Sequence, residues 1–268
     1  MRKKWPKIFI ILGLIACFSF IFYQFFGWDL AARRYKSKVT KLLNQQQDEI
    51  FKPGEKIAFT MRYMGLPAGK AISRVEGIEK YNKRDVYSLS GMARTSDFIS
   101  LFCEVEGWVR SYMDTEKIHS LYFEEESQAS GHRRNKKTLI FNQKELFLEV
   151  EEEKVRILPD TQDPLSAFYF LRLLSNEELK DGYEINIKSR KRDRILSAKL
   201  EGKEILKTPF GDIETIKIYI HLKPVKATSR HEVSGFIWFT DNKKRIPLLV
   251  KLKTKAGPAS LLLFDLEL

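Results

Sequence analysis

Cysteine and histidine are scarce in this sequence, which has two cysteines and four histidines among 268 residues. Cys17 lies inside a long hydrophobic run, which leaves Cys103 as the single thiol outside it. One chain can build neither a disulfide nor a cysteine-based zinc site from a single thiol. The histidines follow no HExxH or similar metal-ligand spacing; they are His119, His132, His221 and His231. We therefore expect neither a metal nor another cofactor.

The sequence also lacks the short motifs that mark common enzyme classes. It contains no GxSxG, GxGxxG or Walker A pattern, so hydrolase, dinucleotide-binding and phosphate-loop functions lose their usual sequence support. Two runs of three glutamates, 124–126 and 151–153, do not replace these motifs, because consecutive residues on a strand point to opposite faces. A protein without enzymatic activity is the favoured interpretation.

Charge is absent from residues 8–28, IFIILGLIACFSFIFYQFFGW, a run of 21 residues. A helix of this length spans about 30 Å, the thickness of the hydrocarbon core of a bilayer. Four basic residues precede the run, which is longer than the hydrophobic part of a cleaved signal peptide. We therefore predict that residues 1–28 form an uncleaved signal anchor, a transmembrane helix in contact with membrane lipid.

The same run contains an alternative means of attachment. Residues 14–17, Leu-Ile-Ala-Cys, resemble the lipobox of bacterial lipoprotein signals, in which the cysteine becomes the acylated first residue. Cys17 would then carry the lipid, although the apolar residues after it are unlike the polar linker of a tethered lipoprotein. Basic residues flank both ends of the run almost equally, so charge alone does not orient it. We expect the short N-terminus to stay in the cytosol and the remainder to face outward.

Residues 29–50 lack glycine and proline and are rich in helix-forming residues. They predict a helical juxtamembrane stalk; the alternative is a basic surface helix that lies on anionic lipid headgroups. Pro53 and Gly54 end the segment. The chain thus divides into an anchor at 1–28, a stalk at 29–50 and a domain at 51–268.

The hydrophobic period changes to two from residue 51 onward. Residues 56–63, 214–221 and 248–254 alternate between apolar and polar side chains, and turn residues separate such runs throughout the domain. Residues 163–174 differ: Asp163 as N-cap and Pro164 at the first position predict a helix that plugs one end of the fold. We therefore predict an all-β, mainly antiparallel domain, a curved sheet or barrel-like structure with one short helix.

A succession of short segments covers about residues 51–265. The segments are FKPGE (51–55), MGLPAGKA (64–71), ART (93–95), DPLSAFYFLR (163–172), TPFG (208–211), IWFTD (237–241) and RIPL (245–248). In order and spacing they resemble the bacterial envelope family catalogued as domain of unknown function 3108. The resemblance implies an exported, mainly antiparallel β domain in an envelope of the Gram-negative type, and it supplies no established activity. Together with the anchor, it implies a single-pass protein of the bacterial inner membrane whose C-terminal domain lies in the periplasm.

Two residues within these segments are candidates for ligand binding. Arg172 lies on an otherwise apolar helix, where we expect it either to pair with an acid such as Asp163 or Asp241 or to reach the carboxylate or phosphate of a ligand. The pairing is the favoured interpretation. Trp238 lies among alternating apolar residues, where packing in the core is favoured over a role as a ligand platform.

A membrane anchor joined to a β domain without catalytic motifs predicts a non-enzymatic binding or envelope-assembly module. Its curved sheet would hold an apolar or lipid ligand, or a segment of an envelope protein. The alternative is an envelope enzyme that acts on glycan or lipid through carboxylates such as Asp97, Asp163 and Asp241. Nucleic acid is not an expected partner. Half of the net charge of +12 flanks the membrane segment, because residues 1–50 hold 9 basic and 3 acidic residues, and residues 51–268 hold 38 and 32.

Overall fold

The computed structural model describes residues 39–40, 42–43, 50–100, 104–130, 133–151, 153–189, 192–225 and 232–268. The predicted signal anchor, Cys17 and most of the predicted stalk lie outside these residues, so the anchor and the lipidation stay predictions. Within the described part of the chain, no helix combines the length and the apolar character that a membrane crossing needs.

In the described residues, fourteen strands form one sheet in which all neighbouring strands are antiparallel. This confirms the prediction of a mainly antiparallel, curved β structure. The strands are β1 (Lys56–Tyr63), β2 (Leu66–Tyr81), β3 (Arg84–Thr95), β4 (Val105–Asp114), β5 (Ser120–Ala129), β6 (Asn135–Asn142), β7 (Phe147–Val150), β8 (Glu153–Arg156), β9 (Tyr183–Ser189), β10 (Arg192–Thr208), β11 (Gly211–Pro224), β12 (Val233–Thr240), β13 (Pro247–Thr254) and β14 (Gly257–Glu267). The labelled helices are α2 (Asp97–Ser100), α3 (Pro164–Phe170) and α4 (Asn176–Asp181).

The sheet consists of two meanders that meet at the pair β1–β14. From β1 the strands run outward in chain order to β8, and from β14 they run backward in chain order to β9. The central pair extends from Lys56 opposite Glu267 to Tyr63 opposite Ala259. β8 and β9 are the two ends of the sheet and do not pair with each other, so the sheet is open and curved rather than a closed barrel.

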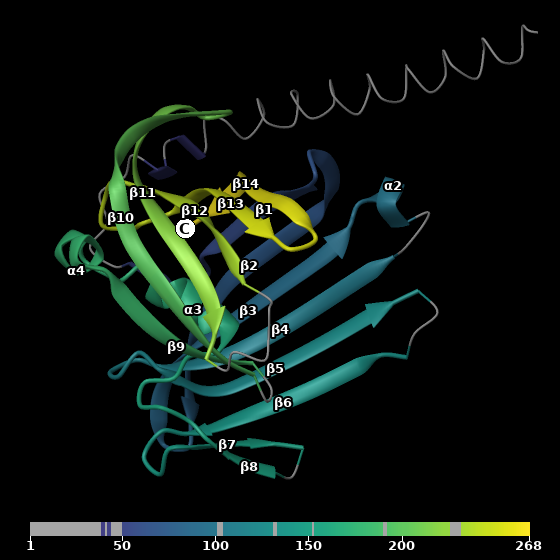
Figure 1. Cartoon of the computed structure of the whole chain (residues 1–268), viewed down its shortest axis with the longest axis vertical. Coiled ribbons are helices and arrows are strands. Elements are labelled where there is room, and N and C mark those ends of the chain that lie inside the picture. The colour runs from purple at the N-terminus through teal and green to yellow at the C-terminus, as the bar shows by residue number, and fades with distance from the viewer. Residues whose placement is uncertain are drawn as a thin grey trace, which may run out of the picture.

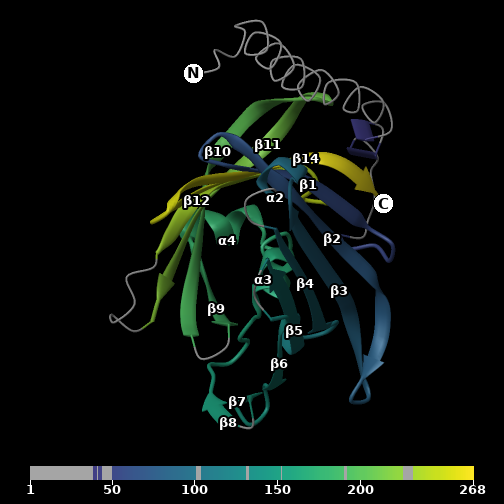
Figure 2. The same cartoon turned by 90° about the vertical axis from the view of Figure 1, so that its right-hand side faces the viewer.

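The connection from β8 to β9 carries α3 and α4 and passes along the concave side of the sheet. Figures 1 and 2 show α3 between the half of the sheet that contains β2–β6 and the half that contains β9–β12. Gln162 in this connection forms a parallel bridge to Ile187 of β9. Its N–H donates to the carbonyl of Asn186 at 2.8 Å, and its carbonyl accepts from the N–H of Lys188 at 2.9 Å. The connection therefore covers part of the β9 edge.

The start of α3 is determined locally. Asp163 is the N-cap, and its side chain accepts the N–H groups of Leu165 and Ser166, while the hydroxyl of Ser166 accepts the N–H of Asp163. Pro164 at the first position lacks only an N–H that a helix start leaves unpaired. This capping box confirms the predicted helix start. The helix ends at Phe170, short of the predicted end.

Apolar side chains fill the concave side of the sheet in three clusters. The first packs α4 and the turn after α3 against β9–β13, and the second packs α3 against strands between β2 and β7. The third joins β1, β13 and β14 to Phe210 in the β10–β11 turn. Proteins pack such interiors at close to crystal density. The protein's own side chains therefore occupy the inside of the curve.

The described residues of the predicted stalk pack into the third cluster. Val39 and Leu43 are helical and only 0% and 3% exposed. Thr40, on the same turn, donates its hydroxyl to the carbonyl of Phe210 at 2.8 Å. The described residues of the stalk thus pack as part of the β domain.

Candidate functional site

Arg172 is buried on the concave side, just after α3, where it pairs with Glu55. Its exposed fraction is 1%. Its guanidinium donates twice to the Glu55 carboxylate, from Nη1 to Oε1 at 2.6 Å and from Nη2 to Oε2 at 2.8 Å. Nη2 also donates to the carbonyls of Ile50 and Lys244, each at 3.0 Å. Two parallel hydrogen bonds are the strong form of an arginine–carboxylate pair.

Glu55 keeps Arg172 charged in this buried position. Burial disfavours the charged guanidinium, but the carboxylate outweighs this effect, and the pKa of Arg172 is raised above its ordinary value. The rings of Phe51 and Tyr169 lie 5.2 and 5.4 Å from the guanidinium carbon. These contacts give Arg172 a structural role, and ligand binding by Arg172 stays a prediction.

The three carboxylates considered for an enzyme lie on different elements. Asp163 caps α3, Asp97 begins α2, and Asp241 follows β12, where it pairs with Lys203. Figure 1 shows α2 at the margin of the sheet and α3 inside its curve. Among the described residues, no hydrogen bond or ion pair joins two of these carboxylates, and neither Asp163 nor Asp241 contacts the guanidinium of Arg172 in this way. The acid that pairs with Arg172 thus differs from the two that the sequence indicated.

Asp163 instead forms the centre of a buried cluster of hydroxyl groups. Ser111 of β4 and Ser120 of β5 both donate to Oδ2, at 2.6 and 2.5 Å. Ser120 also lies 2.6 Å from the hydroxyl of Ser166 on α3. Burial raises the pKa of Asp163 above its ordinary value, and the hydroxyl and N–H donors oppose this rise. The cluster holds the start of α3 against two strands.

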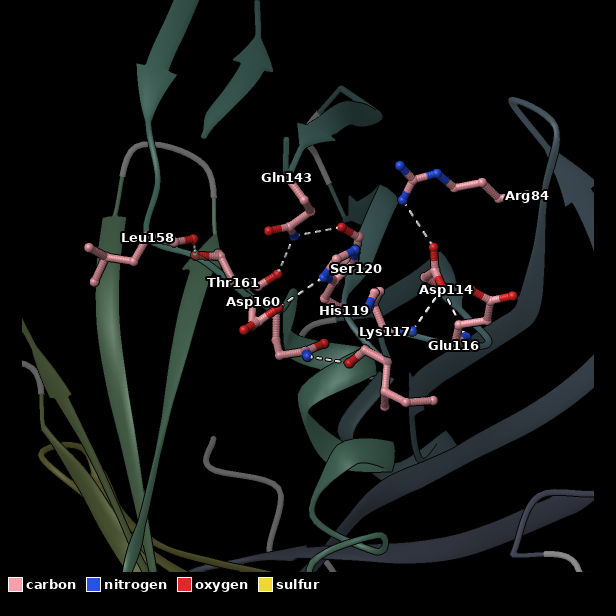
Figure 3. Close-up of polar contacts among 12 residues, drawn as sticks. Arg84, Asp114, Glu116, Lys117, His119, Ser120, Gln143, Leu158, Asp160 and Thr161 are labelled. Atoms are coloured by element: carbon pink, nitrogen blue, oxygen red, sulfur yellow. Dashed lines mark hydrogen bonds and ion pairs between the residues drawn. The ribbon is translucent and has the colours of Figure 1, made fainter. Parts of the chain in front are cut away.

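A second polar network lies beside this cluster and is drawn in Figure 3. Gln143, just after β6, donates to the carbonyls of Ser120 and Thr161, each at 2.8 Å. The Nδ1 of His119 lies 3.1 Å from the Oδ1 of Asp160. The hydroxyl of Ser120 donates to the buried carboxylate described above and not to His119, so the arrangement is not that of a nucleophile with its base. The network joins β5 and β6 to the chain segment before α3.

Asp114 at the end of β4 organises the turn to β5 (Figure 3). Its Oδ1 accepts the N–H groups of Glu116 and Lys117, each at 2.9 Å, and its Oδ2 accepts from Arg84 at 3.1 Å. Burial acts to raise the pKa of Asp114, but these donors outweigh it and lower the pKa below its ordinary value. Asp114 is therefore held as a carboxylate by its fold.

Trp238 lies on the outer face of the sheet, because its two neighbours in β12 belong to the core. It is only 5% exposed. Its indole N–H donates to Glu204, and the ammonium groups of Lys217 and Lys251 lie 5.2 and 5.5 Å from its ring centre. The predicted burial is thus achieved beneath lysine side chains and not in the core. Sequence reasoning missed these lysines, whose signal was the presence of lysine within the alternating runs 214–221 and 248–254.

A shallow depression of about 400 Å³ lies beside the terminal strand β8. Polar and apolar side chains of β6–β8 line it: Thr138, Ile140, Glu149, Val150, Glu151 and Lys154. Across the residues that the structure describes, no group of three or more metal-ligating side chains could hold an ion.

A single open antiparallel sheet, curved around a capped helix with a filled interior, defines a β-barrel-like protein. The chain belongs to the family described as protein of unknown function DUF3108, whose model matches residues 58–263. No curated protein matches the sequence.

The fold is similar to that of a β-barrel-like protein of domain of unknown function DUF1849 from Brucella abortus. That similarity has a TM-score of 0.53 at 7% sequence identity, and covers 81% of this chain and 98% of the other. A "putative lipoprotein" from Parabacteroides distasonis is similar with a TM-score of 0.40 at 12% identity, over 83% and 100% of the two chains. A "putative exported protein with YmcC-like fold" from Bacteroides fragilis has a TM-score of 0.34 at 12% identity, over 81% and 97%.

Proposed function

We propose that this chain is a non-enzymatic envelope-assembly module that holds a segment of a partner protein on its curved sheet. The observation that supports the proposal is that apolar side chains fill the concave side of the sheet. Three apolar clusters, with α3 and α4 among them, occupy the space in which a lipid carrier would enclose its ligand. The interior therefore supports a scaffold more than a carrier of an apolar ligand.

The buried polar groups support the same proposal. Arg172 is engaged by Glu55, and Asp163 is engaged by two serine hydroxyls and the start of α3. An enzyme that uses paired carboxylates needs two of them in one cleft. The separate positions of Asp97, Asp163 and Asp241 give the enzyme alternative no such pair.

The free edge of β8 offers a place for the partner segment. β8 is the last strand of the sheet, and its side chains are mostly exposed. The depression lies across β6, β7 and β8, so the side chains of a strand added at β8 would continue its lining. Pairing of an extended segment with an exposed sheet edge is a recurrent mode of peptide recognition.

The proposed module is tethered to the bacterial inner membrane by residues 8–28 and faces the periplasm. The uncharged run and the short basic N-terminus support this topology. Protease added to spheroplasts should degrade the domain, and a domain protected until the membrane is broken would contradict the orientation.

Native mass spectrometry tests whether the interior holds a lipid or only the protein's own side chains. The full chain is released from membranes in mild detergent for this measurement. We expect the mass of the full polypeptide alone after delipidation; if Cys17 is the acylated first residue, the mass is instead that of residues 17–268 with the attached lipid. A lipid that remains bound at one molecule per chain would contradict the proposal and favour lipid carriage.

A photo-crosslinking residue at Lys154, on the β8 edge, tests the partner site in cells. We expect one crosslinked product of defined mass from position 154 and none from Lys117, which lies in the β4–β5 turn. The same products from both positions would contradict a partner at this edge.

Complementation of cells that lack the chain separates the scaffold from an enzyme. The double variant Asp97→Asn and Asp241→Asn should restore the wild-type envelope phenotype. Loss of function in a variant that folds and accumulates normally would favour the enzyme.

A further inference from the structure

The outer face of β10–β13 carries a group of cations and aromatic rings that the proposed partner site does not use. We call it the outer basic face. It consists of Lys199, Lys217, Tyr219, Phe236, Trp238 and Lys251.

Strand register brings these residues together. Lys199 is opposite Tyr219, which is opposite Phe236, which is in turn opposite Lys251. The rings of Tyr219 and Phe236 are 5.5 Å apart between centres. Residues opposite each other in antiparallel strands point to the same side, so the row forms one continuous surface.

The aromatic rings support the lysines. The ammonium of Lys217 lies 4.7 Å from the ring centre of Phe236 and 5.2 Å from that of Trp238, and Lys251 lies 5.5 Å from Trp238. An ammonium that is held over aromatic rings has little freedom left to lose on binding. The face is therefore a preorganised array of cations.

Three glutamates lie on or beside this side of the strands, and two of them, Glu184 and Glu232, pair with Lys223 and His221. The Oε2 of Glu204 lies 3.9 Å from the Nζ of Lys217, and the Glu204 carboxylate also accepts the indole N–H of Trp238. Within the described ranges, Lys199 and Lys251 form no ion pair, and both are exposed. Three lysines beside one glutamate leave a net positive surface that complements an anionic partner.

We propose that the outer basic face lies against the anionic headgroups of the membrane to which the chain is tethered. This inference rests on the tether of the proposed function. The described end of the stalk reaches the domain at the same strands: Lys244 and Asn242, between β12 and β13, donate to the carbonyls of Leu42 and Leu43 at 2.7 and 3.1 Å. Residues 29–38 span at most about 36 Å even when fully extended. The face is therefore within reach of the bilayer.

Because the chain is tethered, a surface with weak affinity for lipid is sufficient for contact with the membrane. Each lysine near an anionic bilayer raises binding about fivefold, which corresponds to ~1 kcal/mol, so three lysines contribute roughly a hundredfold. A short tether supplies an effective concentration in the millimolar range. Headgroup contact is then favoured in the tethered chain and depends on the anionic lipid.

Lysine acylation in lipid nanodiscs tests the inference with the full chain. The chain is reconstituted in discs of phosphatidylcholine alone and in discs with three parts in ten of phosphatidylglycerol, and the modification of each lysine is measured by mass spectrometry. We expect Lys199, Lys217 and Lys251 to react at least threefold more slowly in the anionic discs, and the difference to vanish at high salt. Equal reaction in both kinds of disc would overturn the inference.

A second measurement compares two triple variants that lose the same charge. Energy transfer reports the distance between a dye on the domain and the bilayer. Replacing Lys199, Lys217 and Lys251 with Gln should abolish the closer approach in anionic discs. Replacing Lys80, Arg134 and Lys136 with Gln removes the same charge from the other half of the sheet, where each of these basic residues pairs with an acid, and should leave the approach intact. An equal loss in both variants would assign the effect to net charge and overturn the inference.

Elution of the chain with the discs separates this inference from the tether. A chain that elutes apart from the discs would contradict the tether and, with it, the headgroup contact. A chain that elutes with the discs but shows no lipid dependence would contradict the headgroup contact alone.

Discussion

The guanidinium of Arg172 and the carboxylate of Glu55 face each other through two parallel hydrogen bonds, although 117 positions separate them in the chain. Glu55 directly precedes β1 at the centre of the sheet, and Arg172 lies two residues after the end of α3 on the concave side. Arg172 also donates to the carbonyl of Lys244, which lies between β12 and β13. One buried ion pair thus joins both meanders to the connection between them.

Glu55→Gln should lower the free energy of unfolding by about 3–5 kcal/mol, because it leaves the guanidinium buried without its counter-charge. Urea unfolding of the full chain in mild detergent, followed by tryptophan fluorescence, measures this change. The control is Lys80→Gln, which breaks a pair with Asp85 in which the two side chains are 70% and 51% exposed. It should cost less than about 1 kcal/mol. Equal losses in the two variants would contradict the central role of the buried pair.

Asp163→Ala should lower the free energy of unfolding by about 2–4 kcal/mol. It removes the N-cap of α3 and leaves the hydroxyls of Ser111 and Ser120 buried without their acceptor. Ser175→Ala removes the N-cap of α4 in an exposed capping box and should cost only about 1 kcal/mol. The same unfolding measurement compares the two, and a smaller loss for Asp163→Ala would show that the buried hydroxyls gain nothing from the carboxylate.

The lowered pKa of Asp114 predicts that the folded protein loses stability in acid. Its folded-state pKa is lowered below the ordinary value of 3.8, so the unfolded chain binds the proton more readily and stability falls as the pH drops below about 4. Above that pH the contribution is fully present. Asp114→Asn cannot titrate, and its stability should fall less steeply between pH 4 and the acid limit of folding. Parallel curves for the wild type and the variant, measured by urea unfolding at each pH, would contradict the assignment.

Lys244→Met should release the end of the stalk from the domain. The ammonium of Lys244 donates to the carbonyl of Leu42 at 2.7 Å, and burial lowers the pKa of Lys244 below its ordinary value. A hydrogen bond from a charged group contributes about 1.5–3 kcal/mol, so trypsin should cleave the basic positions between 33 and 41 at least tenfold faster. The control Lys180→Met, at an exposed position of α4, should leave the rate unchanged. An unchanged rate in Lys244→Met would show that this contact does not hold the stalk.

Local sequence was sufficient to predict a β domain and the start of its helix α3. Alternation at residues 56–63 corresponds to β1 in full, and Asp163 with Pro164 marks the start of α3 because capping depends only on residues three positions apart. A period of two assigns side chains to two faces, but it does not say which strands pair. The central pair β1–β14 therefore could not be read from the pattern.

The candidate site was less accessible to sequence reasoning. Arg172 stood out as a charge on an apolar helix, but its partner Glu55 belongs to a turn whose proline and glycine were the more visible signal. The burial of Trp238 was expected in the core, yet lysines from two neighbouring strands cover it on the outer face. The contact between Arg172 and Glu55 joins segments that are distant in the chain, and the cover of Trp238 comes from the two strands paired with its own. Periodicity contains no information about either contact.

The pairing of β1 with β14 also sets the order in which the protein can form. The central strand β1 is made early, but its partner on one side is the last strand of the chain, so half of its backbone groups must wait for Gly257–Glu267 to emerge. Contacts between such distant residues form slowly. In the proposed topology the polypeptide is threaded across the membrane before its sheet can be completed, and the anchor would hold the incomplete chain at the exit until the final strand arrives.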